Sequence, residues 1–147
     1  MYPKAAIVRL APLTAAVVAA AGRRGAARAR EALALVRVGA DSPMETRLRL
    51  ALVRSGLPEP VVGCLIEGEN GEHTYVDLGF PQYRLAVEYD GVHHLTPQQQ
   101  TRDAMRAKEI ADAGWRLLVI TRGDMRHGGR WVAGRVAEVL RRQGWAG

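Results

Sequence analysis

The spacing of apolar and polar residues divides the chain into a helical beginning and a longer α/β part. Ala5–Ala21 is an almost continuous apolar run that is rich in alanine, and Ala26–Val36 has the spacing of a second helix after the glycines at positions 22 and 25. Because alanine is the strongest helix former, we expect a helical arm or connector, rich in Ala and Arg, over residues 1–40. An α/β domain is expected over residues 41–147.

A start signal for a helix opens the α/β domain. In the segment Ser42-Pro43-Met44-Glu45, a serine at the N-cap precedes a proline at the first helical position and a glutamate at the third. This order is typical of a capping box, in which Ser42 and Glu45 each satisfy a free backbone N–H of the first turn. The helix is expected to end at Gly56.

Two further helices follow the same kind of pattern. Thr96-Pro97 resembles Ser42-Pro43 as a start signal, and the helix that it begins is expected to run to Ala113. A last helix is expected over Arg130–Gln143, where valine and leucine side chains fall on one face.

Four segments have the composition of strands. They are Val61–Glu67, Glu72–Phe80, Tyr83–Tyr89 and Trp115–Thr121. The last is apolar throughout, which is typical of a central strand. The order of elements is therefore α-β-β-β-α-β-α, which predicts an α/β fold with a mixed four-stranded sheet and flanking helices.

Three carboxylates interrupt strands that are otherwise typical of a protein core. Glu88 and Asp90 are two residues apart, so both point to the same face of one strand. A two-residue hairpin at Pro81-Gln82 would place Asp77 opposite Ala86, on the face of Glu88 and one diagonal step away. A three-residue turn would break this relation.

Carboxylates that converge on one face repel one another unless a cation joins them. Ligation by oxygen alone favours Mg²⁺ or Mn²⁺, so the sequence predicts a metal site at Asp77, Glu88 and Asp90. The alternative is that these side chains are exposed on an edge strand and pair with arginines. His93 and His94 follow directly, and one of them could move a proton during hydrolysis. A zinc site that combines the two histidines with Glu88 is a weaker alternative.

The charge distribution suits a protein that gathers cations and binds a polyanion. Residues 1–44 carry a net charge of +5 (7 basic, 2 acidic), residues 45–100 of −4 (4 basic, 8 acidic) and residues 101–147 of +5 (10 basic, 5 acidic). An acidic centre between arginine-rich flanks is compatible with a nucleic-acid enzyme. The alternative is a solvated basic surface in a protein from a GC-rich genome, which encodes Arg in place of Lys.

The predicted location is the cytoplasm, with no membrane partner. Arg9 and Pro12 interrupt the first apolar run, and a membrane span would need about 20 strongly apolar residues. Cys64 is the only cysteine, which excludes a disulfide framework and a cysteine-rich zinc site.

Several cations could bind DNA near the carboxylates. Arg102 and Arg106 are one turn apart on the helix that begins at Thr96-Pro97, and Arg122 and Arg126 follow the last strand. Each could bind the DNA backbone or stabilise charge on the scissile phosphate. Ion pairs with acidic residues on the same helix are the alternative for Arg102 and Arg106.

The order of five motifs resembles a known family. The motifs are Ser42-Pro43-Met44-Glu45, Val76-Asp77-Leu78-Gly79-Phe80-Pro81, Val87-Glu88-Tyr89-Asp90-Gly91-Val92-His93-His94, Arg102-Asp103-Ala104-Met105-Arg106 and Ala113-Gly114-Trp115-Arg116-Leu117-Leu118-Val119-Ile120-Thr121. Together they resemble an uncharacterised endonuclease-like domain of actinobacterial proteins. That domain is similar to the very-short-patch-repair endonucleases of the PD-(D/E)XK, or restriction-endonuclease-like, superfamily.

The resemblance implies a restriction-endonuclease-like core and Mg²⁺-dependent hydrolysis of DNA. Asp77 would be the metal-binding aspartate, Glu88 the second acidic residue and Glu45 the glutamate of the first core helix. Asp90 stands where the superfamily usually has lysine and the mismatch-repair relatives have histidine. Lys108 or His94 could take over the role of that lysine.

Two functions therefore follow from the sequence. The first is a Mg²⁺- or Mn²⁺-dependent DNA endonuclease. The second is a non-catalytic nucleic-acid-binding module, or a toxin–antitoxin accessory module, on a nuclease-like fold. The missing motif lysine favours the second function, and so do the N-terminal helices, which resemble a connector to an upstream antitoxin-like region.

Overall fold

The computed structural model describes residues 8–68, 71–91 and 96–147. The helices are α1 (Leu10–Ala19), α2 (Ala26–Ala34), α3 (Pro43–Arg54), α4 (Pro97–Asp112), α5 (Arg122–Arg126) and α6 (Gly129–Arg142), and a 3₁₀ turn η1 covers Pro81–Tyr83. The strands are β1 (Val61–Glu67), β2 (His73–Phe80), β3 (Leu85–Asp90) and β4 (Arg116–Thr121).

The strands form one mixed sheet in the order β1-β2-β3-β4. The pairs β1–β2 and β2–β3 are antiparallel, and β3–β4 is parallel. Parallel neighbours need a crossover, and α4 supplies it. The predicted mixed four-stranded sheet with flanking helices is confirmed. The position predicted for the last strand is wrong: β4 is an edge strand, in which Ile120 alone is buried.

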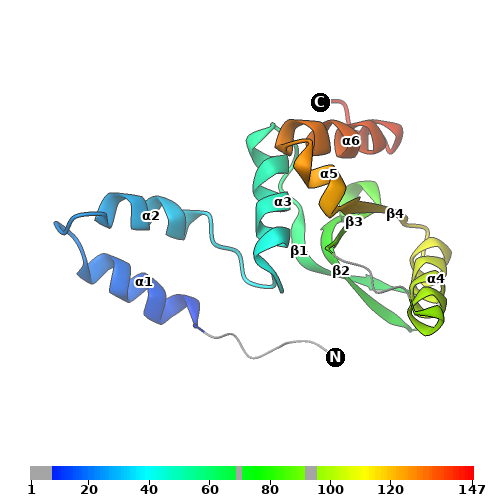
Figure 1. The fold of residues 1–147 in the computed structure, drawn as a ribbon, viewed down its shortest axis with the longest axis horizontal. Helices are drawn as coiled ribbons and strands as arrows, with labels where there is room; N and C mark the ends of the chain where they lie inside the picture. Colours follow the sequence, from blue (N-terminus) through cyan, green and yellow to red (C-terminus); the bar gives the residue numbers. More distant parts are fainter. Residues whose placement is uncertain (1–7, 69–70, 92–95) are drawn as a thin grey trace.

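Two apolar layers sandwich the sheet. α3 and α6 cover one face, where Leu48, Val87 and Val136 are fully buried, and α4 covers the other face (Figure 1). The smaller layer under α4 contains Cys64, Ala86 and Ile110, with other side chains packed around them. Burial of apolar surface on both faces supplies most of the free energy that holds the sheet in place.

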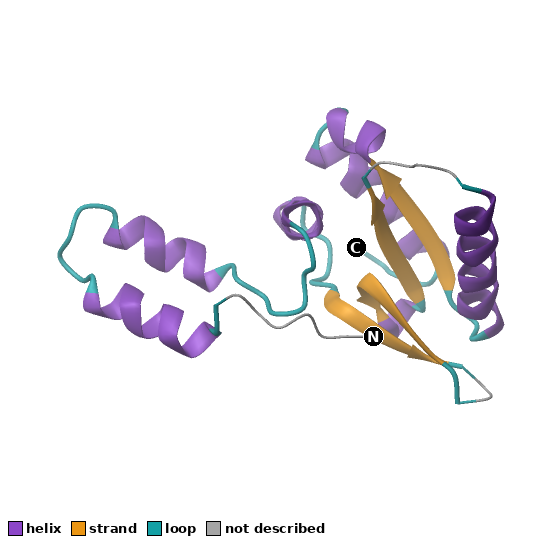
Figure 2. Ribbon diagram, turned by 60° about the horizontal axis from the view of Figure 1, so that its bottom comes forward, coloured by secondary structure: helices purple, strands orange, loops and turns teal. Residues whose placement is uncertain are grey.

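The N-terminal helices lie to one side of the sheet. Figure 2 shows α1 and α2 side by side, joined to the remainder by an extended segment. No residue of α1 is buried, and the helix therefore adds nothing to the core of the α/β part. Among the residues that the structure describes, no helix is long and apolar enough to cross a membrane.

The connection between β2 and β3 is longer than the sequence analysis predicts. Phe80 pairs with Leu85 rather than with Tyr83, so four residues form the turn, and Arg84 at its end has a positive φ of 46°. Four residues and two residues both leave the alternation of faces unchanged. Asp77 directly precedes Leu78 on β2, and Glu88 directly follows Val87 on β3. The two acids therefore flank the same pair of residues and do not have the predicted diagonal relation.

β1 and β2 both exchange faces in the middle of the strand. Side chains two residues apart on a regular strand share a face. However, Val62 packs in the layer of α3 and α6 whereas Cys64 packs under α4, and Leu78 and Val76 differ in the same way. The pairing of β1 with β2 omits Gly63 and Asp77 between these residues, and Gly63 has a φ of +59°. Asp77 thus lies at the point where β2 turns over.

Two local predictions about helices need correction. No helix is predicted between the last strand and Arg130, but Arg122–Arg126 forms the short helix α5, which Thr121 and Asp124 begin with a reciprocal capping box. At α3 the Ser42 hydroxyl accepts from the N–H of Glu45 as predicted, but the Glu45 carboxylate accepts from the N–H of Asp41 at 2.6 Å instead of from Ser42. Among the described helices, complete capping boxes form instead at α4, between Thr96 and Gln99, and at α5.

Candidate active site

Asp77 bridges the gap that opens between β2 and β3. The ladder of the two strands ends at Leu78–Val87. Beyond it, an Oδ2 of Asp77 accepts a hydrogen bond of 2.8 Å from the backbone N–H of Tyr89. A side chain thus replaces a backbone acceptor, and the carboxylate is held between the strands at the centre of the sheet. Asp77 is half-buried, as expected for a carboxylate that interrupts a strand typical of a protein core.

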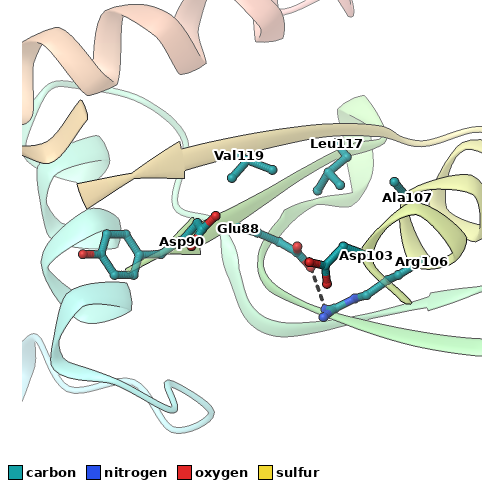
Figure 3. A pocket seen from close by; sticks show the side chains of 8 residues that line it. Glu88, Asp90, Asp103, Arg106, Ala107, Leu117 and Val119 are labelled. Carbon is teal, nitrogen blue, oxygen red and sulfur yellow. Dashed lines mark ion pairs between the residues drawn. The ribbon is translucent and has the colours of Figure 1, made fainter. Parts of the chain in front are cut away.

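Glu88 follows on β3 and points toward α4. Together with Asp90, Asp103 and Arg106 it lines a pocket of about 410 Å³, in which the side chain of Glu88 lies against α4 (Figure 3). Val119 of β4 pairs with Glu88 and lines the same pocket, as expected for side chains on one face of parallel strands. The prediction that Glu88 and Asp90 share a face is confirmed.

Arg106 is the cation of this pocket. Its Nη2 lies 2.6 Å from Oε1 of Glu88 and also donates to the backbone carbonyl of Tyr75. The Glu88 oxygen is buried and, although it is this close to the guanidinium, has no properly aligned hydrogen-bond partner among the residues that the structure describes. Charge attraction is therefore present while the directional part of the interaction is not satisfied.

Burial and mutual repulsion make both carboxyl groups hard to ionise. Burial raises the pKa of Asp77, and the carboxylate of Glu45 raises it further, although the Tyr89 N–H and Arg106 act in the opposite direction. Burial also raises the pKa of Glu88 against the lowering effect of Arg106, and nearby Asp77 adds to the increase. Two acids with pKa values displaced upward at one place are typical of functional sites.

Asp90 lies close enough to act on Glu88. It ends β3, lines the same pocket and is among the groups that raise the pKa of Glu88. Among the described residues, however, no group of three or more His, Cys, Asp or Glu side chains could hold a metal ion. In the described part of the chain, the carboxylates Asp77, Glu88 and Asp90 thus do not form a ready-made cage. His93 and His94 lie outside the described residues.

Glu45 approaches the site from the other side. It is 8% exposed in the first turn of α3, and its charge acts on Asp77. Asp77 therefore stands between Glu45 of α3 and the pair formed by Glu88 and Arg106 near α4. Four separate elements, α3, β2, β3 and α4, contribute these groups, which is why helix and strand periodicity alone could not bring all of them together.

Lys108 lies away from these carboxylates. Its ammonium group is exposed and forms an ion pair with Asp112 one turn later on α4. Hydrogen bonding to Asp112 raises the pKa of Lys108, and the other carboxylate that acts on it belongs to Glu72. The structure therefore gives Lys108 no contact with the carboxylates that it was predicted to assist.

The predicted DNA-binding arginines fall into two places. Arg102 lines a shallow hollow beside Arg106 on α4, over the start of β2. Arg122 and Arg126 lie on α5, at the opposite side of β3, where they line a different hollow together with Arg47 of α3.

Sequence analysis missed Asp103 and Arg47 as residues near the site. Asp103 lies one turn before Arg106 on α4, lines the Glu88 pocket and raises the pKa of Glu88. The i, i+3 spacing with Arg106 was a signal that could have found it. No local pattern in the sequence relates Arg47 of α3 to the residues of α5.

Two curated proteins resemble the chain. Uncharacterized protein MT2308 of Mycobacterium tuberculosis (strain CDC 1551 / Oshkosh) and uncharacterized protein Rv2248 of Mycobacterium tuberculosis (strain ATCC 25618 / H37Rv) are each 37% identical to it over 127 residues. The match covers 86% of this chain and 47% of each relative, so the chain spans about half the length of these relatives. No family model matches the chain, and no solved structure does.

Proposed function

We propose that this chain is a Mg²⁺-dependent DNA endonuclease, which would also accept Mn²⁺, on a restriction-endonuclease-like core. The observation that carries the proposal is the pair Asp77 and Glu88, two carboxylates with raised pKa values at the point where β2 and β3 separate. Two partly buried acids close to one another lower the stability of a fold unless a cation or hydrogen-bond donors compensate their charge. Its retention at a break in the sheet therefore supports a cation-binding role.

Two carboxylates are enough protein ligands for a magnesium ion. Mg²⁺ is commonly held by one or two carboxylates, while water and substrate oxygens complete its shell, so a cage of three protein ligands is not required. Oε1 of Glu88, buried and without an aligned hydrogen-bond donor among the described residues, is the oxygen that a cation would satisfy. Asp90 is expected to add negative charge beside it.

Each residue of the site has a separate task in phosphodiester hydrolysis. A bound Mg²⁺ would neutralise charge on the phosphate and lower the pKa of the attacking water. The Tyr89 N–H holds the Asp77 carboxylate in a fixed orientation, which avoids the cost of ordering it during the reaction. Arg106, once released from Glu88, would stabilise the charge that develops on the phosphate. His94 remains the predicted proton carrier, and Lys108 is left without a role.

The test is nicking of supercoiled plasmid with Mg²⁺ or Mn²⁺ by the wild-type chain, Asp77→Ala and Glu88→Ala. Asp112→Ala is the matched control, because it removes an exposed carboxylate that pairs with Lys108 and does not line the pocket. We expect nicking by the wild type and the control, and a loss of at least about 100-fold in each site variant. Cleavage that survives both site substitutions would disprove the assignment of Asp77 and Glu88.

A non-catalytic nucleic-acid-binding or toxin–antitoxin accessory module is the second candidate. The contact of Arg106 with Glu88 and with the Tyr75 carbonyl favours it, since a protein cation then already occupies the place next to the buried oxygen. This candidate predicts DNA binding that weakens with salt and is unchanged by chelation of divalent ions.

Thermal unfolding with and without MgCl₂ separates the two candidates without measuring activity. A ligand that binds only the folded state raises Tm, by an amount that increases with its concentration. The endonuclease predicts such an increase for the wild type and none for Asp77→Ala. The accessory module predicts that the Tm of neither protein changes with the Mg²⁺ concentration.

A further inference from the structure

A basic hollow lies on the side of β3 that faces away from the Glu88 pocket. Arg47 of α3 and Arg122 and Arg126 of α5 line it, and its volume is about 580 Å³. The three arginine side chains come from two helices that are distant in the sequence. All three residues are exposed, so their guanidinium groups are accessible to a ligand.

The three arginines lack acidic partners in the part of the chain that the structure describes. Arg47 has one polar contact there, a donor contact of 3.8 Å to the sulfur of Met44, and no ion pair involves Arg122 or Arg126. Other arginines of the same protein pair with carboxylates; Arg135 of α6, for example, pairs with Asp124 of α5. Three unneutralised cations around one hollow repel one another, and a bound anion would relieve this repulsion.

The remaining lining of the hollow is apolar or aromatic. Met44, Met125 and Tyr89 contribute to it, together with Gly91, which adds no side chain. Arginines around an apolar floor match a sugar-phosphate backbone, whose phosphates are anionic and whose deoxyribose carbon surface is not. Inorganic anions would use the arginines alone and leave the floor exposed.

The hollow adjoins the candidate active site on two elements. Met44 and Arg47 flank Glu45 in the first turns of α3, and Tyr89 follows Glu88 on β3 while its backbone N–H holds Asp77. A DNA strand bound in the hollow would therefore lie next to the gap between β2 and β3. Figure 1 shows α3 and α5 meeting on this side of the sheet, opposite α4.

We propose that Arg47, Arg122 and Arg126 bind the phosphodiester backbone of a DNA strand on the α3–α5 side of the carboxylates. The inference rests on the proposed function, in that DNA is the partner, and adds the surface on which the strand lies. Contacts of this kind position the backbone and do not read the base sequence. The protein is thus expected to bind DNA with little dependence on sequence through this surface.

The experiment measures binding of a fluorescently labelled 20-base-pair DNA duplex in EDTA, at several salt concentrations, by fluorescence anisotropy. The variant Arg47→Gln/Arg122→Gln/Arg126→Gln is compared with Arg24→Gln/Arg28→Gln/Arg30→Gln. The second triple removes the same charge from exposed positions on and beside α2. Exposed substitutions of this kind usually change stability by less than about 0.5 kcal/mol, so both proteins should fold.

If the hollow holds the backbone, its triple variant binds at least about tenfold more weakly near 0.1 M salt, and its salt slope falls by about 2 to 3, whereas the control triple changes little. Equal losses in the two triples, or unchanged binding in the first, would overturn the proposal. The result is independent of catalysis: nicking that depends on Asp77 together with unchanged binding in the hollow variant leaves the endonuclease and removes this surface. Weaker binding by the hollow variant, together with a wild type that does not nick plasmid, supports the surface and disproves the endonuclease.

Discussion

At the scale of single residues, Asp77 and Glu88 differ from Glu59 and Asp124 in the direction in which their surroundings shift the pKa of the carboxyl group. Arg37 lowers the pKa of Glu59, and hydrogen bonds from Thr121, with Arg135, lower that of Asp124 against the effect of burial. At Asp77 and Glu88 burial dominates and raises the pKa. Glu59 and Asp124 stabilise the fold when ionised. Asp77 and Glu88 destabilise it, which is the usual cost of a group kept for function.

The variant Asp77→Asn should therefore be more stable than the metal-free wild type at neutral pH, by about 1 kcal/mol, a common size for a single stabilising substitution. The Asn oxygen can still accept from the Tyr89 N–H, so only the charge is lost. Because the folded-state pKa of Asp77 is raised, the native state binds the extra proton, and the cost of the ionised carboxylate grows as pH rises above the ordinary pKa of an aspartate.

Urea unfolding of Asp77→Asn and wild type between pH 3 and pH 7 measures this effect. The difference in the free energy of unfolding should be small at the acid end and largest at pH 7, and MgCl₂ should reduce it by stabilising the wild type alone. Asp112→Asn is the control, since its exposed carboxylate pairs with Lys108. A less stable Asp77→Asn at pH 7 would show that the carboxylate is a structural group.

At the scale of elements, alternation along β2 and β3 predicts the site better than the details of the hairpin do. The predicted two-residue turn is wrong, but a connection with an even number of residues keeps the pair Leu78–Val87 on one face, so Asp77 and Glu88 still flank the same pair of residues. The turnover of β2 at Asp77 could not be predicted, because it depends on the paired strand, where Gly63 adopts a positive φ. Local periodicity contains no information about a partner strand.

The edge position of β4 and the helix α5 show the same limit. The apolar run Trp115–Thr121 is typical of a central strand, yet among the described strands β4 pairs with β3 alone, and helix packing covers part of its surface. The capping residues Thr121 and Asp124 were present in the sequence as a signal for α5, although the glycine at position 123 obscured it. The N-terminus of a helix can be predicted from its capping residues, whereas the order of strands in a sheet depends on the tertiary fold.

Gly79 of β2 should be intolerant of any side chain. A Cβ there would lie 2.5 Å from the Cβ of Cys64 and closer still to its Sγ, in the layer under α4. We expect Gly79→Ala to lower the free energy of unfolding by about 1–3 kcal/mol through overpacking. Gly134→Ala is the matched control: the same change on α6 meets nothing within 4 Å and should stabilise by about 0.5–1 kcal/mol.

Equilibrium urea unfolding of both alanine variants gives the comparison. Opposite signs for the two substitutions are expected, because the helical position gains propensity while the strand position gains a clash. Equal or stabilising effects at both positions would mean that β1 and β2 separate easily at Cys64, and the close approach of the strands next to Asp77 would then be doubtful.

At the scale of the whole molecule, one polar cluster joins the N-terminal arm to the sheet and its helices. Arg49 of α3 is 2% exposed and donates to the carbonyl of Leu35, just after α2, and to Glu59 at 2.8 Å. Glu59 also pairs with Arg37 in the segment that follows α2. The carboxylate of Glu59 thus pairs with Arg37 of the N-terminal arm and with Arg49 of the α/β part. The buried guanidinium of Arg49 depends on it for charge compensation.

Substituting Glu59→Gln should loosen the arm without unfolding the sheet. Arg49 would lose its charged partner and Arg37 would lose its ion pair, so we expect faster backbone hydrogen exchange over residues 35–41 and little change over α6. The hydrogen bond of Arg37 lowers the pKa of Glu59, so its contribution to stability is present above the ordinary pKa of a glutamate and is lost as pH falls through the lowered value. Wild-type protein at acid pH should therefore exchange in this segment like Glu59→Gln.

Hydrogen exchange followed by mass spectrometry measures this, with Glu138→Gln as the control. Glu138 pairs with Arg142 one turn away on the exposed surface of α6, so its loss removes a pair of the same type but joins no two parts of the chain. Glu138→Gln should leave exchange over residues 35–41 unchanged. If it accelerates exchange there as much as Glu59→Gln does, the effect follows from net charge, and the cluster around Glu59 is not what joins the arm to the sheet.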